Sequence, residues 1–88
     1  MRQATLRQPR QLARETRNAL AEYLAALEEI YPAAKGTIRI ITRQDKRVIV
    51  SIHLPTRARE RMRLFDRMAE VGTRLLIETS QYIILSGR

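Results

Sequence analysis

The chain has 88 residues, a net charge of +8, one histidine and no cysteine. This length allows one domain with a thin core, and the lack of cysteine excludes disulfides, thiolate nucleophiles and sulfur-ligated metals. No apolar run reaches the roughly 18 residues of a membrane span, and the opening residues MRQATLRQPR lack the apolar run of a secretory signal. We therefore expect one cytoplasmic domain over residues 1–88, with 1–8 as a flexible basic arm and 87–88 as a frayed tail.

A first helix is predicted over residues 9–31. Pro9 suits its first turn, and the apolar positions that follow recur at helical spacing. They form one broad stripe, which consists of Leu12, Thr16, Ala19, Leu20, Tyr23, Leu27 and Ile30. Pro32 disfavours helical geometry in the residue before it, so the helix ends at Tyr31.

A hairpin of two strands is predicted after this helix. The segments TIRIITR (37–43) and RVIVSIHL (47–54) are rich in β-branched residues, which favour strands. The polar residues Gln44, Asp45 and Lys46 separate the two segments and suit a turn.

A second helix is predicted from Thr56, which can cap it, to Gly72, which can stop it. Its apolar seam consists of Ala58, Met62, Phe65 and Ala69, and Leu64 and Met68 widen it to one side. The segments TRLLIET (73–79) and QYIILS (81–86) then flank Ser80 and predict a second hairpin. The resulting order α-β-β-α-β-β indicates an α+β fold, a four-stranded antiparallel sheet with two helices packed mainly on one face.

The predicted strands are apolar on both faces, although a sheet covered on one face normally alternates apolar and polar residues. The expected core face of the first hairpin consists of Ile38, Ile40, Val48, Val50 and Ile52, and the expected apolar patch on the far face consists of Ile41, Ile49, Leu76, Ile83 and Leu85. Such a patch usually marks an interface. We therefore expect self-association, as a homodimer or another homo-oligomer, or docking of a protein partner through this face. The alternative is a three-layer monomer in which one helix crosses to the far face.

The sequence shows no catalytic or metal-binding motif. His53 shares a strand face with Ser51, but no orienting acid lies in the local pattern. Most carboxylates lie one helical turn from an arginine, which is the layout of surface ion pairs, and three scattered glycines cannot form a phosphate-binding loop. We expect no enzyme, no cofactor, no metal, no membrane and no small-molecule substrate, and hence a small non-catalytic interaction or regulatory protein.

Nucleic-acid binding is the alternative function, because 15 of the 17 basic residues are arginine, which binds phosphate in a bidentate fork. An acidic protein would satisfy the same arginines, and a heat-adapted or GC-rich source also favours arginine in surface ion pairs. The candidate contacts to phosphate or to an acidic partner lie on the expected basic arm and on the two predicted helices: Arg7, Arg10, Arg14, Arg17, Arg59, Arg63 and Arg67. Acids one turn from the last three favour a salt-bridged surface there instead. Tyr82 is the single candidate for base stacking, so contact with the phosphate backbone is favoured over base readout.

Overall fold

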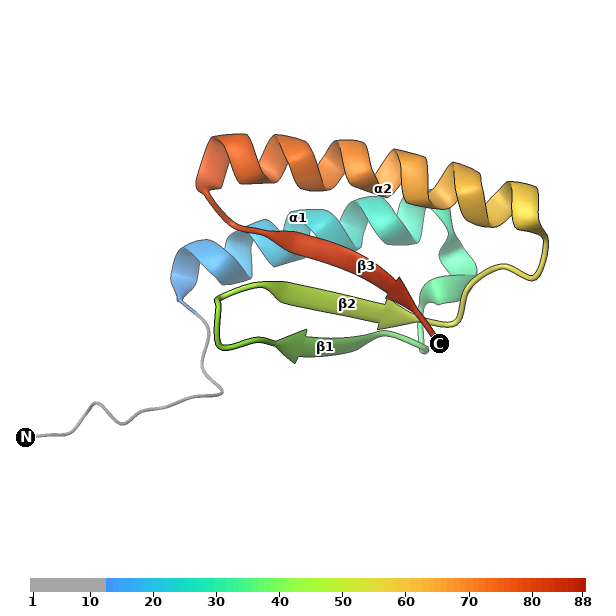
Figure 1. Ribbon diagram of the computed structural model, residues 1–88, viewed down its shortest axis with the longest axis horizontal. Coiled ribbons are helices and arrows are strands. Elements are labelled where there is room, and N and C mark those ends of the chain that lie inside the picture. Colours follow the sequence, from blue (N-terminus) through green and yellow to red (C-terminus); the bar gives the residue numbers. More distant parts are fainter. Residues whose placement is uncertain (1–12) are drawn as a thin grey trace, which may run out of the picture.

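The structure, a computed structural model, describes residues 13–88 and has the order α-β-β-α-β, with a short 3-10 helix after the first helix (Figure 1). The elements are α1 (Arg14–Ile30), η2 (Pro32–Ala34), β1 (Arg39–Thr42), β2 (Val48–Ile52), α2 (Ala58–Thr79) and β3 (Ile83–Gly87). The fold is therefore α+β, with two α-helices and a three-stranded sheet.

The sheet is mixed, with β2 at the centre of the order β1-β2-β3. The predicted first hairpin is confirmed, since β1 and β2 pair in antiparallel register with Thr42 opposite Val48. β3 runs parallel to β2, with Ile83 also opposite Val48. The predicted four-stranded antiparallel sheet is therefore wrong, both in its number of strands and in the direction of the last strand.

The predicted strand 73–79 is the C-terminal part of α2, so the second hairpin does not form. Short runs of leucine and isoleucine suit a helix as well as a strand, and here Leu75 continues the buried seam of Leu64 and Met68. The helix ends at Thr79, and the next residue, Ser80, caps it: its φ of 61° is left-handed and its N–H donates to the carbonyl oxygen of Leu76. Because α2 carries the chain back along the sheet, β3 enters parallel to β2.

Gly72 lies inside α2 and does not stop it, contrary to the prediction. A Cβ atom at this position would lie 3.1 Å from the carbonyl oxygen of Ile83 and 3.7 Å from Cε2 of Tyr23. The missing side chain therefore allows the helix to approach the main chain of β3 closely.

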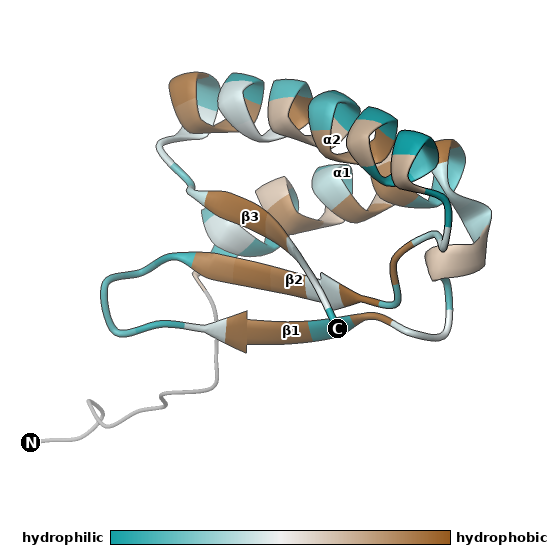
Figure 2. Ribbon diagram, turned by 45° about the vertical axis from the view of Figure 1, so that its right-hand side comes forward, coloured by the Kyte–Doolittle hydropathy of each residue, from teal (hydrophilic) through white to brown (hydrophobic). Residues whose placement is uncertain are grey.

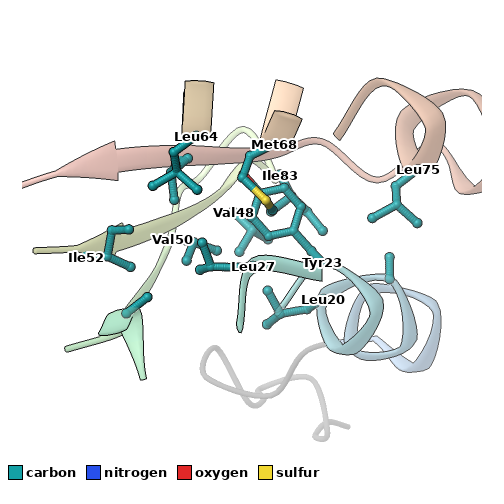
Figure 3. Packing of buried hydrophobic residues seen from close by; sticks show 13 residues of the cluster. Leu20, Tyr23, Leu27, Val48, Val50, Ile52, Leu64, Met68, Leu75 and Ile83 are labelled. Carbon is teal, nitrogen blue, oxygen red and sulfur yellow. The ribbon is translucent and has the colours of Figure 1, made fainter. Parts of the chain in front are cut away.

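Both helices pack on the same face of the sheet, which gives two layers (Figure 2). Alternate residues of β2 and β3 point into the space between the layers and meet the buried seams of the helices. The largest fully buried side chains are Tyr23, Leu27, Val48, Val50, Ile52, Met68 and Leu75 (Figure 3). Over residues 13–88 no helix covers the second face, so the three-layer alternative is not observed in this part of the chain.

The predicted stripe of the first helix is confirmed where the structure describes it, because Ala19, Leu20, Tyr23 and Leu27 are buried. Residues 1–12, which include the expected basic arm and Leu12, lie outside the described residues. At the other end Gly87 belongs to β3, and the main-chain N–H of Arg88 donates to the carbonyl oxygen of Ile52 at 3.0 Å. The segment 87–88, expected as a frayed tail, is therefore paired with β2.

Candidate functional site

The face of the sheet that the helices leave uncovered carries a row of isoleucines. The register places Ile41 opposite Ile49 and Ile49 opposite Ile84, and residues opposite one another point to the same face. Ile41 is 46% exposed, and the other two are half-buried. This row is the apolar centre of what we call the open face, whose residues are Arg39, Ile41, Arg43, Arg47, Ile49, Ser51, Ile84 and Arg88.

Arginines border the isoleucine row along β1 and the turn that follows it. On one side, Arg39 is opposite Ser51 in the register. On the other side, Arg43 donates its main-chain N–H to the carbonyl oxygen of Arg47 at 2.9 Å, so the ladder continues one residue beyond the strands. Arg47 also pairs with Asp45 at 2.7 Å, an exposed contact that holds the turn. The main-chain N–H of Arg47, together with its guanidinium group, lowers the pKa of the Asp45 carboxyl.

Arg88 closes the other end of the open face. Its Nη1 donates to Oγ of Ser51 at 2.9 Å, and its Nη2 donates to the carbonyl oxygen of Thr37. The guanidinium group therefore lies across Ser51, which is only 7% exposed. Because Arg88 is 37 positions from Ser51, no local pattern in the sequence indicates this contact. His53, the other residue considered with Ser51, is exposed, and its N–H donates to Oγ1 of Thr37 at 3.2 Å.

The two layers of the molecule differ in charge. Eight of the nine acidic residues lie on the helices: Glu15, Glu22, Glu28 and Glu29 on α1, and Glu60, Asp66, Glu70 and Glu78 on α2. With two arginines on α1 and five on α2, the helices together carry a net charge of −1. Residues 31–57 and 80–88 hold seven basic residues against Asp45 alone, a net charge of +6. Most of the positive charge of the described chain therefore belongs to the sheet and its loops.

The arginines proposed from the sequence do not form one surface. Arg14 and Arg17 are exposed on α1, which is the acidic helix, whereas Arg7 and Arg10 lie outside the described residues. The other three, Arg59, Arg63 and Arg67, are exposed together on α2.

The ion pairs of the helices involve a different arginine from those considered in the sequence. Arg74 lies 3.2 Å from Glu78 and 3.9 Å from Glu22. Within residues 13–88 no ion pair joins the three arginines 59, 63 and 67 to an acid. The salt-bridged surface expected around these three arginines is therefore not observed in this part of the chain.

The predicted interface residues fall into three different environments. Ile41 and Ile49 lie on the open face as expected. Ile83 and Leu85 point to the opposite face, where the helices bury them, and Leu76 belongs to α2. Sequence reasoning missed the role of Ile84, since the three consecutive apolar residues 83–85 leave the face of each undetermined until the pairing with β2 is known.

A second apolar surface lies beside β3, at the edge of the sheet. A groove of about 270 Å³ runs between α2 and β3 and is lined on the α2 side by Phe65, Ala69, Gly72, Thr73 and Leu76. Phe65 is 37% exposed, Leu76 is 41% exposed and Tyr82, at the start of β3, is 47% exposed. Burial raises the pKa of Tyr23, which forms part of the floor of the groove.

The structure shows neither a metal cluster nor a membrane-spanning helix in residues 13–88. Within the described residues, no group of three or more histidine, cysteine, aspartate and glutamate side chains is placed to hold a metal ion. In the same part of the chain, no helix is both long and apolar enough to cross a membrane. No protein-family model matches the chain, and comparisons with curated proteins and with solved structures find no match either.

Proposed function

We propose that the protein binds nucleic acid through the open face, by contacts between its arginines and the phosphate backbone. The segregation of charge is the observation that carries this proposal, because the sheet and its loops hold a net charge of +6 while the helices hold −1. A polyanion meets almost no opposing carboxylate on the open face. Arginine also forms bidentate hydrogen bonds with phosphate oxygens, which favours it over lysine for this contact.

The geometry of the open face suits a strand of nucleic acid that lies across the sheet. Arg39 begins β1 and Arg43 directly follows it, four residues later, so their Cα atoms are separated by about 13 Å. The isoleucine row lies between these two arginines and offers an apolar strip to sugars and bases. With no aromatic residue in this row, base stacking contributes little, so binding is expected to depend weakly on sequence and strongly on salt.

Charge also favours some partners of the open face over others. Two copies joined through this face would bring arginines against arginines, and unpaired like charges are costly when they lose water. The open face therefore suits an acidic partner better than a second copy. An acidic protein has the same sign of charge as nucleic acid, and the experiment below separates the two.

The experiment measures the binding of duplex DNA, duplex RNA and single strands across a salt series, with polyglutamate as the acidic polypeptide probe. Contact with about four phosphates predicts a slope of log affinity against log salt near −3 to −4 for a duplex. The triple variant Arg39→Gln, Arg43→Gln, Arg47→Gln should flatten this slope by about 2 to 3, because each lost phosphate contact removes about 0.9.

The matched control is the triple variant Arg14→Gln, Arg17→Gln, Arg59→Gln, which removes the same charge from exposed positions on the helices. It should bind nearly as well as the unmodified protein. Equal losses in both variants would mean that net charge, and not the open face, determines binding. Polyglutamate that binds as tightly as nucleic acid would favour an acidic protein partner, and failure to bind any of these probes at low salt would refute the proposal.

A further inference from the structure

The apolar side of α2 that lies over the groove has no part in the binding proposed for the open face. Helices pack 8–10 Å apart, whereas strands in a sheet are about 4.8 Å apart, so two helices are wider than three strands. One side of α2, the helix next to β3 at the edge of the sheet, is therefore not covered by the sheet. This uncovered side is the stripe Met62, Phe65, Ala69, Thr73 and Leu76, whose spacing of 3 or 4 residues places it on one side of the helix.

We infer that this stripe is the interface of a homodimer, in which α2 of one copy packs antiparallel against α2 of a second copy. The stripe is self-complementary about its central residue, Ala69. An antiparallel pair centred there places Met62 opposite Leu76 of the other copy and Phe65 opposite Thr73. Large side chains thus lie at both ends, and the small central residue allows the helix axes to approach each other.

The charge on α2 supports this antiparallel arrangement. Residues 58–68 contain four arginines and two acids, a net charge of +2, whereas residues 70–79 contain one arginine and two acids, a net charge of −1. An antiparallel pair therefore sets the basic half of each helix against the acidic half of the other. A parallel pair would set the basic half of each helix against the basic half of the other, and the acidic half against the acidic half. This arrangement would cost electrostatic energy along the whole contact.

Main-chain groups of β3 that have no strand partner also favour a second copy over the groove. Val48 N–H donates to the carbonyl oxygen of Tyr82, and Arg88 N–H donates to that of Ile52, so even-numbered residues of this strand direct their polar groups to β2. The main-chain groups of Ile83, Leu85 and Gly87 consequently face the free edge of the sheet. An uncovered edge of this kind promotes aggregation, and a second copy seated over the groove shields it.

The size of the stripe sets the expected strength of the dimer. From residue 62 to residue 76 the stripe is about 21 Å long, at 1.5 Å per residue, and roughly one helix wide. Contacts of this extent are at the lower end of protein interfaces, so we expect a dissociation constant in the micromolar range. With the twofold axis beside β3, the open faces of both copies point to the same side.

The first experiment measures the molar mass by light scattering or sedimentation from about 1 μM to about 500 μM. We expect a rise from one chain to two. Leu76→Asp should remain monomeric over this range, because it places an unpaired charge in the contact. The matched control is Ile41→Asp, at a residue of the open face with similar exposure (46% against 41% for Leu76), which should dimerise like the unmodified protein. Circular dichroism checks that both variants are folded.

A second experiment uses the absence of native cysteine. A disulfide needs Cα atoms about 4.4 to 6.8 Å apart, which two copies of residue 69 satisfy when the helices cross there. Ala69→Cys should give a covalent dimer on mild oxidation, whereas Ala21→Cys, exposed on α1, should give little. The proposal is overturned if the protein stays monomeric throughout, if Ile41→Asp separates the chains and Leu76→Asp does not, or if both cysteine variants cross-link equally.

Discussion

Replacement of Gly72 by alanine tests the closest contact between α2 and β3. Alanine is favoured over glycine inside a helix by about 1 kcal/mol, so in an open position the change would stabilise the protein. Here the new Cβ would lie 3.1 Å from the carbonyl oxygen of Ile83, a few tenths of an ångström inside a comfortable distance. The oxygen belongs to the main chain of a strand that is paired with β2, so it cannot rotate away as a side chain would.

Overpacking of this kind costs about 1 to 3 kcal/mol. We therefore expect Gly72→Ala to lower the free energy of unfolding by about 1 kcal/mol after the gain in helix propensity has been subtracted. For a domain of this size such a loss lowers Tm by roughly 4 to 8 °C. Urea unfolding, followed by circular dichroism at one fixed protein concentration, measures the change directly.

The control for this experiment is Ala21→Gly, at an exposed position inside α1. It reports the difference in propensity between alanine and glycine in this protein without a steric term. If Gly72→Ala stabilises the protein by as much as Ala21→Gly destabilises it, the contact with β3 imposes no cost. The explanation of Gly72 as a close-approach residue would then be wrong.

Two further predictions concern stability. Burial raises the pKa of Tyr23, so above pH 10 the unfolded chain loses a proton that the folded state retains, and the free energy of unfolding should fall by about 1.4 kcal/mol per pH unit from there until the folded pKa is reached. This slope should vanish in Tyr23→Phe and persist in Tyr82→Phe; a slope that is the same in both variants would count against the assignment. The contact between Arg88 and Ser51 should give a coupling energy of about 0.5 to 1.5 kcal/mol in a double-mutant cycle with alanine at both positions, and additive effects would show that the contact contributes nothing.

The sequence was sufficient for the first hairpin and for the body of the first helix, because each carries a strong local pattern, but not for the start of that helix, since Ala13 is extended and α1 begins at Arg14. The helical spacing from Ala19 to Leu27 and the β-branched residues on either side of the turn leave little choice of element. Strand alternation in the hairpin also placed Ile41 and Ile49 on the open face correctly. These features depend on neighbours within about ten residues, which the sequence displays directly.

The remaining features depend on contacts between distant segments. The segment TRLLIET is helical because Leu75 continues a buried seam with Met68 and Leu64, two and three turns earlier, and this burial outweighs the strand preference of a short apolar run. Only the parallel pairing of β3 with β2 determines on which face of the sheet Ile84 lies. Likewise Arg88, the last residue of the chain, became part of the open face through a hydrogen bond that spans 37 positions.

The separation of charge between the layers has a consequence for the approach of any charged partner. With −1 on the helices and +6 on the sheet and its loops, residues 13–88 have an electric dipole that points roughly across the two layers. The field of a polyanion exerts a torque on this dipole, and this torque turns the sheet toward the polyanion before the two molecules touch. The same torque should orient the protein on a negatively charged support, with the helices outward and the β3 edge accessible from the side.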